Sequence, residues 1–241
     1  MPIRIACRKK FLIISNKKEV IVMNRFEYFK EIAKNAKVLG EGWDKVLEAA
    51  LIMHGHLCGA MPLGFRAGRL ALKVLGEERE PIMAKIALVE TGVFHAAACF
   101  VDGVQFSTGC TYGKDLIRKL DYGKWAVTIA IKKDKRAVRV SVKPEVIQTA
   151  FKGKFLAERK KGVPPTEVPQ EYILQPFINT ITRPDEELLD VSEIFTYEFK
   201  PTPKPSFEIG KCEVCGEMVA ENNMRIKEGK KVCLPCSGYE V

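Results

Sequence analysis

Two Cys-x-x-Cys pairs near the end of the chain constrain its fold more than any other feature. The first pair is Cys212 and Cys215, and the second, after seventeen intervening residues, is Cys233 and Cys236. Each pair can direct two sulfur atoms at one point, and tetrahedral zinc binds four thiolates at about 2.3 Å. The spacing is typical of zinc sites. The sequence therefore predicts a small C-terminal module held by a structural zinc ion with a complete ligand shell.

The alternative interpretation of these pairs is two disulfides or redox-active dithiols. We favour zinc because the basic N-terminal stretch has too short an apolar segment, Phe11 to Ile14, to be a secretory signal. Paired cysteines in a cytoplasmic chain more often bind metal than form disulfides. No apolar run is long enough to span a membrane. We therefore expect a cytoplasmic location.

Composition divides the chain into four parts. Residues 1–22 are predicted to be an N-terminal extension outside the fold, and a candidate non-native segment, because a second methionine, Met23, precedes the first helical pattern. Residues 23–161 are predicted to form the core. Residues 162–205 hold eight of the thirteen prolines and are predicted to be an extended connector packed on the core. Residues 206–241 form the four-cysteine module.

Hydrophobic periodicity in the core indicates mixed helices and strands. The mostly antiparallel pattern that results is typical of the α+β class. The helices are expected at 24–39, 41–53, 62–75, 115–120 and 144–158, and the strands at 82–89, 125–131 and 137–142. Residues 99–106 fit either a helix or a strand, and we favour a short helix.

Positive charge is concentrated in one part of the core. Residues 132–161 contain eleven Lys and Arg against three acidic residues. Such a stretch can bind nucleic acid. We favour a solvated surface instead, because few aromatic side chains that would stack on bases lie among the charges. The four-cysteine module, with six Glu against five Lys and Arg, is also a poor phosphate binder.

A second cluster of potential ligands lies upstream, where His54, His56 and Cys58 fall within five residues beside Gly55 and Gly59. Cys58 precedes a predicted helix, and the positive end of a helix lowers the pKa of a nearby thiol. That placement favours a metal ligand or a reactive thiolate.

Two more cysteines are candidates for the same pocket. Cys110 lies in a similar glycine-rich turn, and Cys99 shares a predicted helical face with Asp102. The alternative for Cys58 and Cys99 is that they are small buried hydrophobic residues. For His95, an exposed or otherwise satisfied side chain is the favoured interpretation.

Several motifs around these residues resemble the FmdE family, which takes its name from formylmethanofuran dehydrogenase. The matching segments are HGHLCG at 54–59, LGFRAG at 63–68, CFVDGVQ at 99–105, TGCTYG at 108–113, DYGK at 121–124 and KRAVRV at 135–140. The resemblance extends from about residue 42 to the C-terminus. It implies an α+β core, often dimeric, with a treble-clef zinc finger.

The resemblance also implies pocket residues. It places His56, Cys58, Cys99, Asp102, Gln105 and Cys110 at the family's pocket positions, with His54 beside them. This chain differs from the family pattern at Gly59 and Ala60. It also has a longer segment before Cys99, which makes His95 a candidate substitute ligand.

Three functions remain open at this point. The first is a metal-binding accessory or regulatory protein, a homodimer with a partner among redox or one-carbon enzymes and a second divalent metal in the core pocket. The second is an enzyme that uses this metal or the Cys58 thiolate, with His56 and Asp102 as further candidate catalytic residues. The third and weakest is a nucleic-acid-binding regulator.

Overall fold

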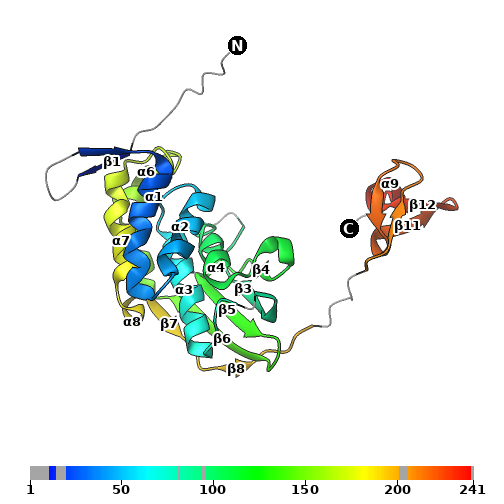
Figure 1. Ribbon diagram of the computed structural model, residues 1–241, viewed down its shortest axis with the longest axis horizontal. Coiled ribbons are helices and arrows are strands. Elements are labelled where there is room, and N and C mark those ends of the chain that lie inside the picture. The colour runs from blue at the N-terminus through cyan, green and yellow to red at the C-terminus, as the bar shows by residue number, and fades with distance from the viewer. Residues whose placement is uncertain (1–10, 15–19, 81, 94–95, 201–205, 240–241) are drawn as a thin grey trace, which may run out of the picture. The chain divides into compact units, whose positions relative to one another are not determined.

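The computed structural model describes residues 11–14, 20–80, 82–93, 96–200 and 206–239. The chain forms two compact units, Met1–Glu198 and Phe199–Val241 (Figure 1). The first unit is the core, with a central sheet and packed helices, and the second contains the four cysteines.

The central sheet of the core has the strand order β4-β3-β5-β6-β7, with β8 also paired to β6. Every neighbouring pair is antiparallel except β3 and β4. β3 and β5 are buried along their whole length, in line with their mostly apolar sequences. The predicted α+β class is confirmed. The strands are β3 (Lys85–Val89), β4 (Ile117–Lys119), β5 (Ala126–Ile131), β6 (Arg136–Val142), β7 (Leu189–Val191) and β8 (Phe195–Thr196).

Helices pack around this sheet, and their ends follow from local sequence. α1 begins at a capping box, in which Asn24 accepts hydrogen bonds from the backbone of Phe26 and Glu27. α3 ends where Gly76 adopts a left-handed conformation. The helices are α1 (Arg25–Ala33), α2 (Trp43–His54), α3 (Ala60–Leu75), α4 (Phe100–Thr108), α5 (Pro144–Phe151), α6 (Lys154–Lys160), α7 (Leu174–Thr182) and α8 (Asp185–Leu188).

α3 and α4 cross at very close range because glycines occupy the contact. A Cβ atom on Gly64 would lie 2.0 Å from the carbonyl oxygen of Phe100, and one on Gly103 would lie 2.0 Å from that of Met61. Real Cβ atoms do not approach backbone atoms so closely, so both positions require glycine. The crossing brings the N-terminal ends of the two helices together.

The segment 162–205 differs from the expected extended connector. It contains α7, α8, β7 and β8, and two of its strands belong to the central sheet. The prolines misled the prediction because Pro176 lies in the first turn of α7 and Pro184 caps α8, both positions where proline suits a helix. Phe177 of α7 is fully buried, so this segment packs on the core as predicted.

Arg66 joins this segment to α3. Its buried guanidinium donates to the backbone carbonyls of Thr180, Ile181 and Arg183, at 2.7 to 2.8 Å, and to the carboxylate of Asp185. The carbonyls at the end of α7 would otherwise lack donors. One side chain thus fixes α7 and α8 to the core.

Three further expectations differ from the structure. Residues 117–119 form β4 and are not helical, because they pair in parallel with β3. The predicted helix at 144–158 is two helices, separated at Lys152 and Gly153. The predicted extension contains two paired strands, β1 (Phe11–Ile14) and β2 (Val20–Met23).

The four-cysteine unit consists of two hairpins and one turn of helix. Glu228 and Gly229 both have positive φ, which gives the tight turn between its last two strands. Its elements are β9 (Ile209–Lys211), β10 (Met218–Ala220), β11 (Met224–Lys227), β12 (Lys230–Cys233) and α9 (Leu234–Ser237). Across the part of the chain that the structure describes, no helix is both long and apolar enough to cross a membrane.

Candidate metal centre and adjoining pocket

Four of the predicted core ligands come together. One potential ligand atom from each of His54, His56, Cys58 and Cys99 lies within 4.8 Å of the others. The two histidine rings are close and tilted, with centroids 4.2 Å apart. The residues come from the end of α2, the loop that follows it and the start of α4, so tertiary packing assembles the cluster.

Local backbone structure explains why these side chains converge. α2 ends at His54 because Gly55 adopts a left-handed conformation that reverses the chain. Cys58 lies just before α3, and its sulfur accepts a hydrogen bond from the backbone N–H of Met61 at 3.4 Å. Cys99 caps α4. Both sulfurs therefore lie at helix N-termini, where the partial positive charge favours thiolates.

Asp102 orients one of the histidines. Its Oδ2 atom lies 2.8 Å from Nδ1 of His54, which leaves Nε2 directed at the cluster, 3.4 Å from the sulfur of Cys58. The side chain of Gln105 approaches the other oxygen of Asp102 at 3.5 Å. A carboxylate behind a histidine is the usual arrangement at metal sites, because it fixes the tautomer and the ring orientation.

The cluster alters the protonation of its own members. Burial lowers the pKa of His54, but hydrogen bonds to Asp102 and Cys99 outweigh that effect and raise it to about 9. The hydrogen bond from Cys58 is the main reason why the pKa of Cys99 falls far below its usual value. The same hydrogen bond, together with burial, raises the pKa of Cys58, although the backbone N–H groups of Ala60 and Met61 at the start of α3 act to lower it. The lowered pKa expected for Cys58 from its position before a helix is therefore wrong. Without a metal, these shifts favour a thiolate at Cys99 and protonated forms of Cys58 and His54, so metal binding would release protons.

The donor set fits a divalent ion such as zinc. Two imidazoles and two thiolates match the S₂N₂ tetrahedral sites that zinc prefers. All four donors together would fill a tetrahedral shell, so an open coordination position would require one donor to withdraw. Chemically, such an ion could polarise a carbonyl or activate a bound water.

Two candidates from the sequence lie elsewhere. Cys110 is fully buried, its sulfur is 3.9 Å from the backbone oxygen of Lys85, and it is not part of the cluster. Burial raises the pKa of its thiol, which is typical of an inert core cysteine. The structure therefore does not bring Cys110 to the expected pocket. His95 lies outside the described residues.

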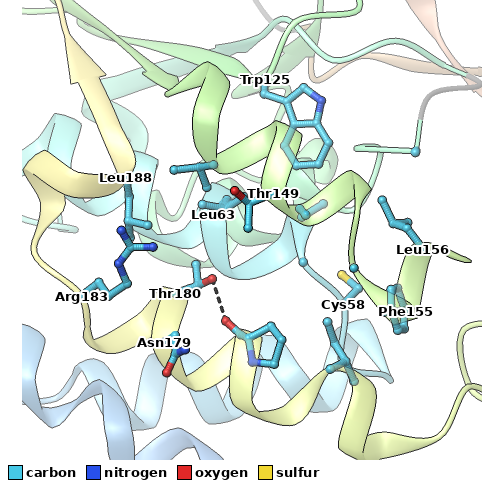
Figure 2. A pocket seen from close by; sticks show the side chains of 18 of the residues that line it. Cys58, Leu63, Trp125, Thr149, Phe155, Leu156, Asn179, Thr180, Arg183 and Leu188 are labelled. Carbon is cyan, nitrogen blue, oxygen red and sulfur yellow. Dashed lines mark hydrogen bonds between the residues drawn. The ribbon is translucent and has the colours of Figure 1, made fainter.

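A pocket of about 440 Å³ adjoins the cluster, and Cys58 forms part of its wall (Figure 2). Its other walls come from the first turn of α3, from Trp125 and from α5, α6, α7 and α8. Sequence reasoning missed these residues. A helical, amphipathic pattern at 174–182 was the available signal, and the surrounding prolines concealed it.

In the second unit, the predicted four cysteines also converge, with one sulfur from each of Cys212, Cys215, Cys233 and Cys236 within 4.8 Å of the others. The backbone N–H of Cys233 donates to the sulfur of Cys212 at 3.3 Å. Hydrogen bonds from backbone N–H groups, first that of Cys215, lower the pKa of Cys212 to about 6. Such N–H donors stabilise thiolate ligands.

The fold and the sites define a class of protein: an α+β core with a His/Cys ligand cluster, linked to a separate four-cysteine module. The chain belongs to the FmdE family, whose description is "Molybdenum formylmethanofuran dehydrogenase operon" and whose model matches residues 53–190. Residues 205–240 match the prokaryotic dksA/traR C4-type zinc finger. Together with the cysteine cluster, that match indicates a structural zinc site.

This chain is similar to two proteins, one by sequence and one by structure. A probable S-adenosyl-L-methionine-binding protein of Archaeoglobus fulgidus is 32% identical over 80% of this chain, which spans only 53% of that relative's length. The crystal structure of a tungsten formylmethanofuran dehydrogenase FmdE-like protein from Syntrophus aciditrophicus has a TM-score of 0.52 and 22% identity. The matched region covers 83% of this chain and 95% of the chain in that crystal structure. The likeness to this structure concerns the fold.

Proposed function

We propose that this chain is a metal-binding accessory or regulatory protein of one-carbon redox metabolism. Its core would bind one divalent ion through His54, His56, Cys58 and Cys99, and its zinc finger would serve stability or protein contact. The observation that carries the proposal is the convergence of four donor atoms with Asp102 behind one of them. A complete shell of protein ligands favours a structural or regulatory ion over a catalytic one.

Elemental analysis of the purified protein tests this proposal. We expect two metal ions per chain in the wild type, one for each cluster, and one in either Cys58→Ser or Cys212→Ser. Cys110→Ser is the matched control, because this cysteine is buried but lies outside both clusters, and it should keep both ions. One ion in the wild type, unchanged by Cys58→Ser, would refute the core metal site.

The same proposal includes a homodimer and a protein partner among redox or one-carbon enzymes, in line with the description of the family. Light scattering on the purified protein tests the dimer, which a monomeric mass would exclude. Nucleic acid is not proposed as a partner, because much of the basic stretch is neutralised within the fold. Arg136 pairs with Glu77, and Arg139 pairs with Glu90.

A second candidate function is the binding of a small molecule in the pocket beside Cys58. If the protein is an enzyme, this molecule would be its substrate. The pocket favours this function, because a ligand there would contact a sulfur of the metal cluster. The name of the Archaeoglobus fulgidus relative makes S-adenosyl-L-methionine the first ligand to test. Isothermal titration calorimetry on the metal-loaded protein measures this directly. Absence of heat would remove this ligand and leave other ligands of the pocket open.

A further inference from the structure

We propose that the pocket beside Cys58 binds a small molecule with an apolar, ring-containing body and a polar head that is uncharged or cationic. The inference rests on the second function proposed above, ligand binding, and holds whether or not the core cluster contains a metal. The pocket volume, about 440 Å³, lies within the range of small-molecule sites, roughly 300–1,000 Å³.

Apolar side chains form the interior of this pocket. Leu63 and Leu188 are buried in its wall, and three aromatic residues, Trp125, Phe155 and Tyr172, also line it. Figure 2 shows Trp125 and Phe155 on different sides of the hollow. Aromatic walls favour a ring, because ring pairs gain energy beyond the area that they bury.

Most of the polar side chains that line the pocket are exposed, and two of them, Glu145 and Glu187, are acidic. Arg183 is the one basic residue among those that line the pocket, and its Nε donates to Glu187 at 2.8 Å. Figure 2 shows Asn179 and Arg183 across the pocket from Cys58. Because Arg183 and Glu187 pair with each other, the lining carries one unpaired charge, the carboxylate of Glu145, which disfavours an anionic head. The basic side chains of α6, such as Lys154 with its Nζ 5.4 Å from the ring centre of Tyr172, are not among the lining residues.

Two of the helices around the pocket, α5 and α6, are incompletely packed, which favours a ligand that completes them. α5 has no buried residue, and α6 has only Phe155. Val146 and Ala150 on α5 line the hollow and are half-buried. An apolar ligand would remove their remaining exposed surface from water, which stabilises the complex by about 25 cal/mol per Å².

A matched set of three naphthalene compounds tests the class of ligand. 1-Naphthylmethylamine is cationic, 1-naphthalenemethanol is uncharged and 1-naphthoate is anionic at neutral pH. We expect calorimetry or NMR titration of the full chain to show binding of the amine and the alcohol, with the carboxylate at least about tenfold weaker. Failure of both the amine and the alcohol to bind at millimolar concentration would overturn the inference, and equal binding of the carboxylate would overturn the assignment of its head.

Two substitutions on α5 locate the binding. Ala150→Phe fills the hollow and should abolish binding of the amine, whereas Gln148→Phe, on the same helix but outside the pocket, should not change it. Equal binding by the two variants would refute the site. Metal content measured on the same samples separates the two proposals: a wild type that binds the amine without a core metal supports the pocket and refutes the metal site.

Discussion

Replacing Arg66 by methionine is expected to be among the most destabilising single changes in the core. The side chain of Arg66 is 2% exposed, and it ends in hydrogen bonds to three backbone carbonyls and to Asp185. Methionine fills much of the same volume but donates no hydrogen bond. The substitution therefore leaves the carbonyls at the end of α7 without a donor and removes the main partner of a largely buried carboxylate.

The size of the stability loss depends on the contacts that Asp185 keeps after the substitution. Breaking a buried ion pair costs about 3–5 kcal/mol, because the other charge stays in the interior. Arg69 still reaches Asp185, with its Nη1 atom 3.4 Å from the carboxylate, so the lower end of the range applies. We expect a loss of about 3 kcal/mol, which for a chain of this size lowers Tm by roughly 6–12 °C.

Urea and thermal unfolding, followed by circular dichroism at a fixed metal concentration, measure this loss. Arg183→Met is the matched control: its pair with Glu187 is about half exposed on both sides, so its loss should cost less than about 1 kcal/mol. The double variant Arg66→Met/Asp185→Leu should recover part of the stability, since no buried charge is then stranded. A loss below about 1 kcal/mol for Arg66→Met alone would refute the reasoning.

Three further predictions concern the cluster and the helix crossing. Asp102→Asn should weaken core metal binding by roughly 10–100-fold in competition with a chelator, because His54 loses its orienting carboxylate; unchanged affinity would contradict this role. The raised pKa of His54, about 9, stabilises the metal-free core fully below pH 6.5, and this stabilisation is lost as the pH rises through 9. Metal binding at pH 7 should therefore release a proton, which calorimetry in buffers of different ionisation enthalpy measures. A binding enthalpy that does not depend on the buffer would exclude this proton release. Gly103→Ala should lower the free energy of unfolding in urea by at least about 3 kcal/mol, since its Cβ would overlap a carbonyl oxygen. In Gly113→Ala the new Cβ faces open space, so the free energy of unfolding should stay within about 0.5 kcal/mol of the wild type. Similar losses for both variants would argue against the close crossing of α3 and α4.

The sequence predicted best those groups of ligands whose members lie close together along the chain. The four cysteines of the second unit converge as their pairs imply, and His54, His56 and Cys58 lie together because Gly55 turns the chain between them. Cys99 joins them through the crossing of α3 and α4. Sequence alone could name Cys99 as a partner, but it could not show that two glycines allow the approach.

Prediction failed where side-chain direction and distant packing decide. Cys110 lies in a glycine-rich turn like that of Cys58, yet its sulfur points at the backbone of β3. The pocket draws its walls from segments more than 100 residues apart, such as Leu63 and Leu188, and no local pattern encodes such an enclosure. The prolines of residues 162–205 indicated an extended chain, although Pro176 lies in the first turn of α7 and Pro184 caps α8.

The close crossing of α3 and α4 has a consequence for how the core unfolds. Cys58 and Cys99 bracket 40 residues that include all of α3 and β3. An ion bound to both sulfurs would act as a reversible cross-link that holds this loop closed, and complete unfolding would have to release it. Stability would then rise with the concentration of free metal, so metal supply would set how long a newly made chain withstands proteolysis.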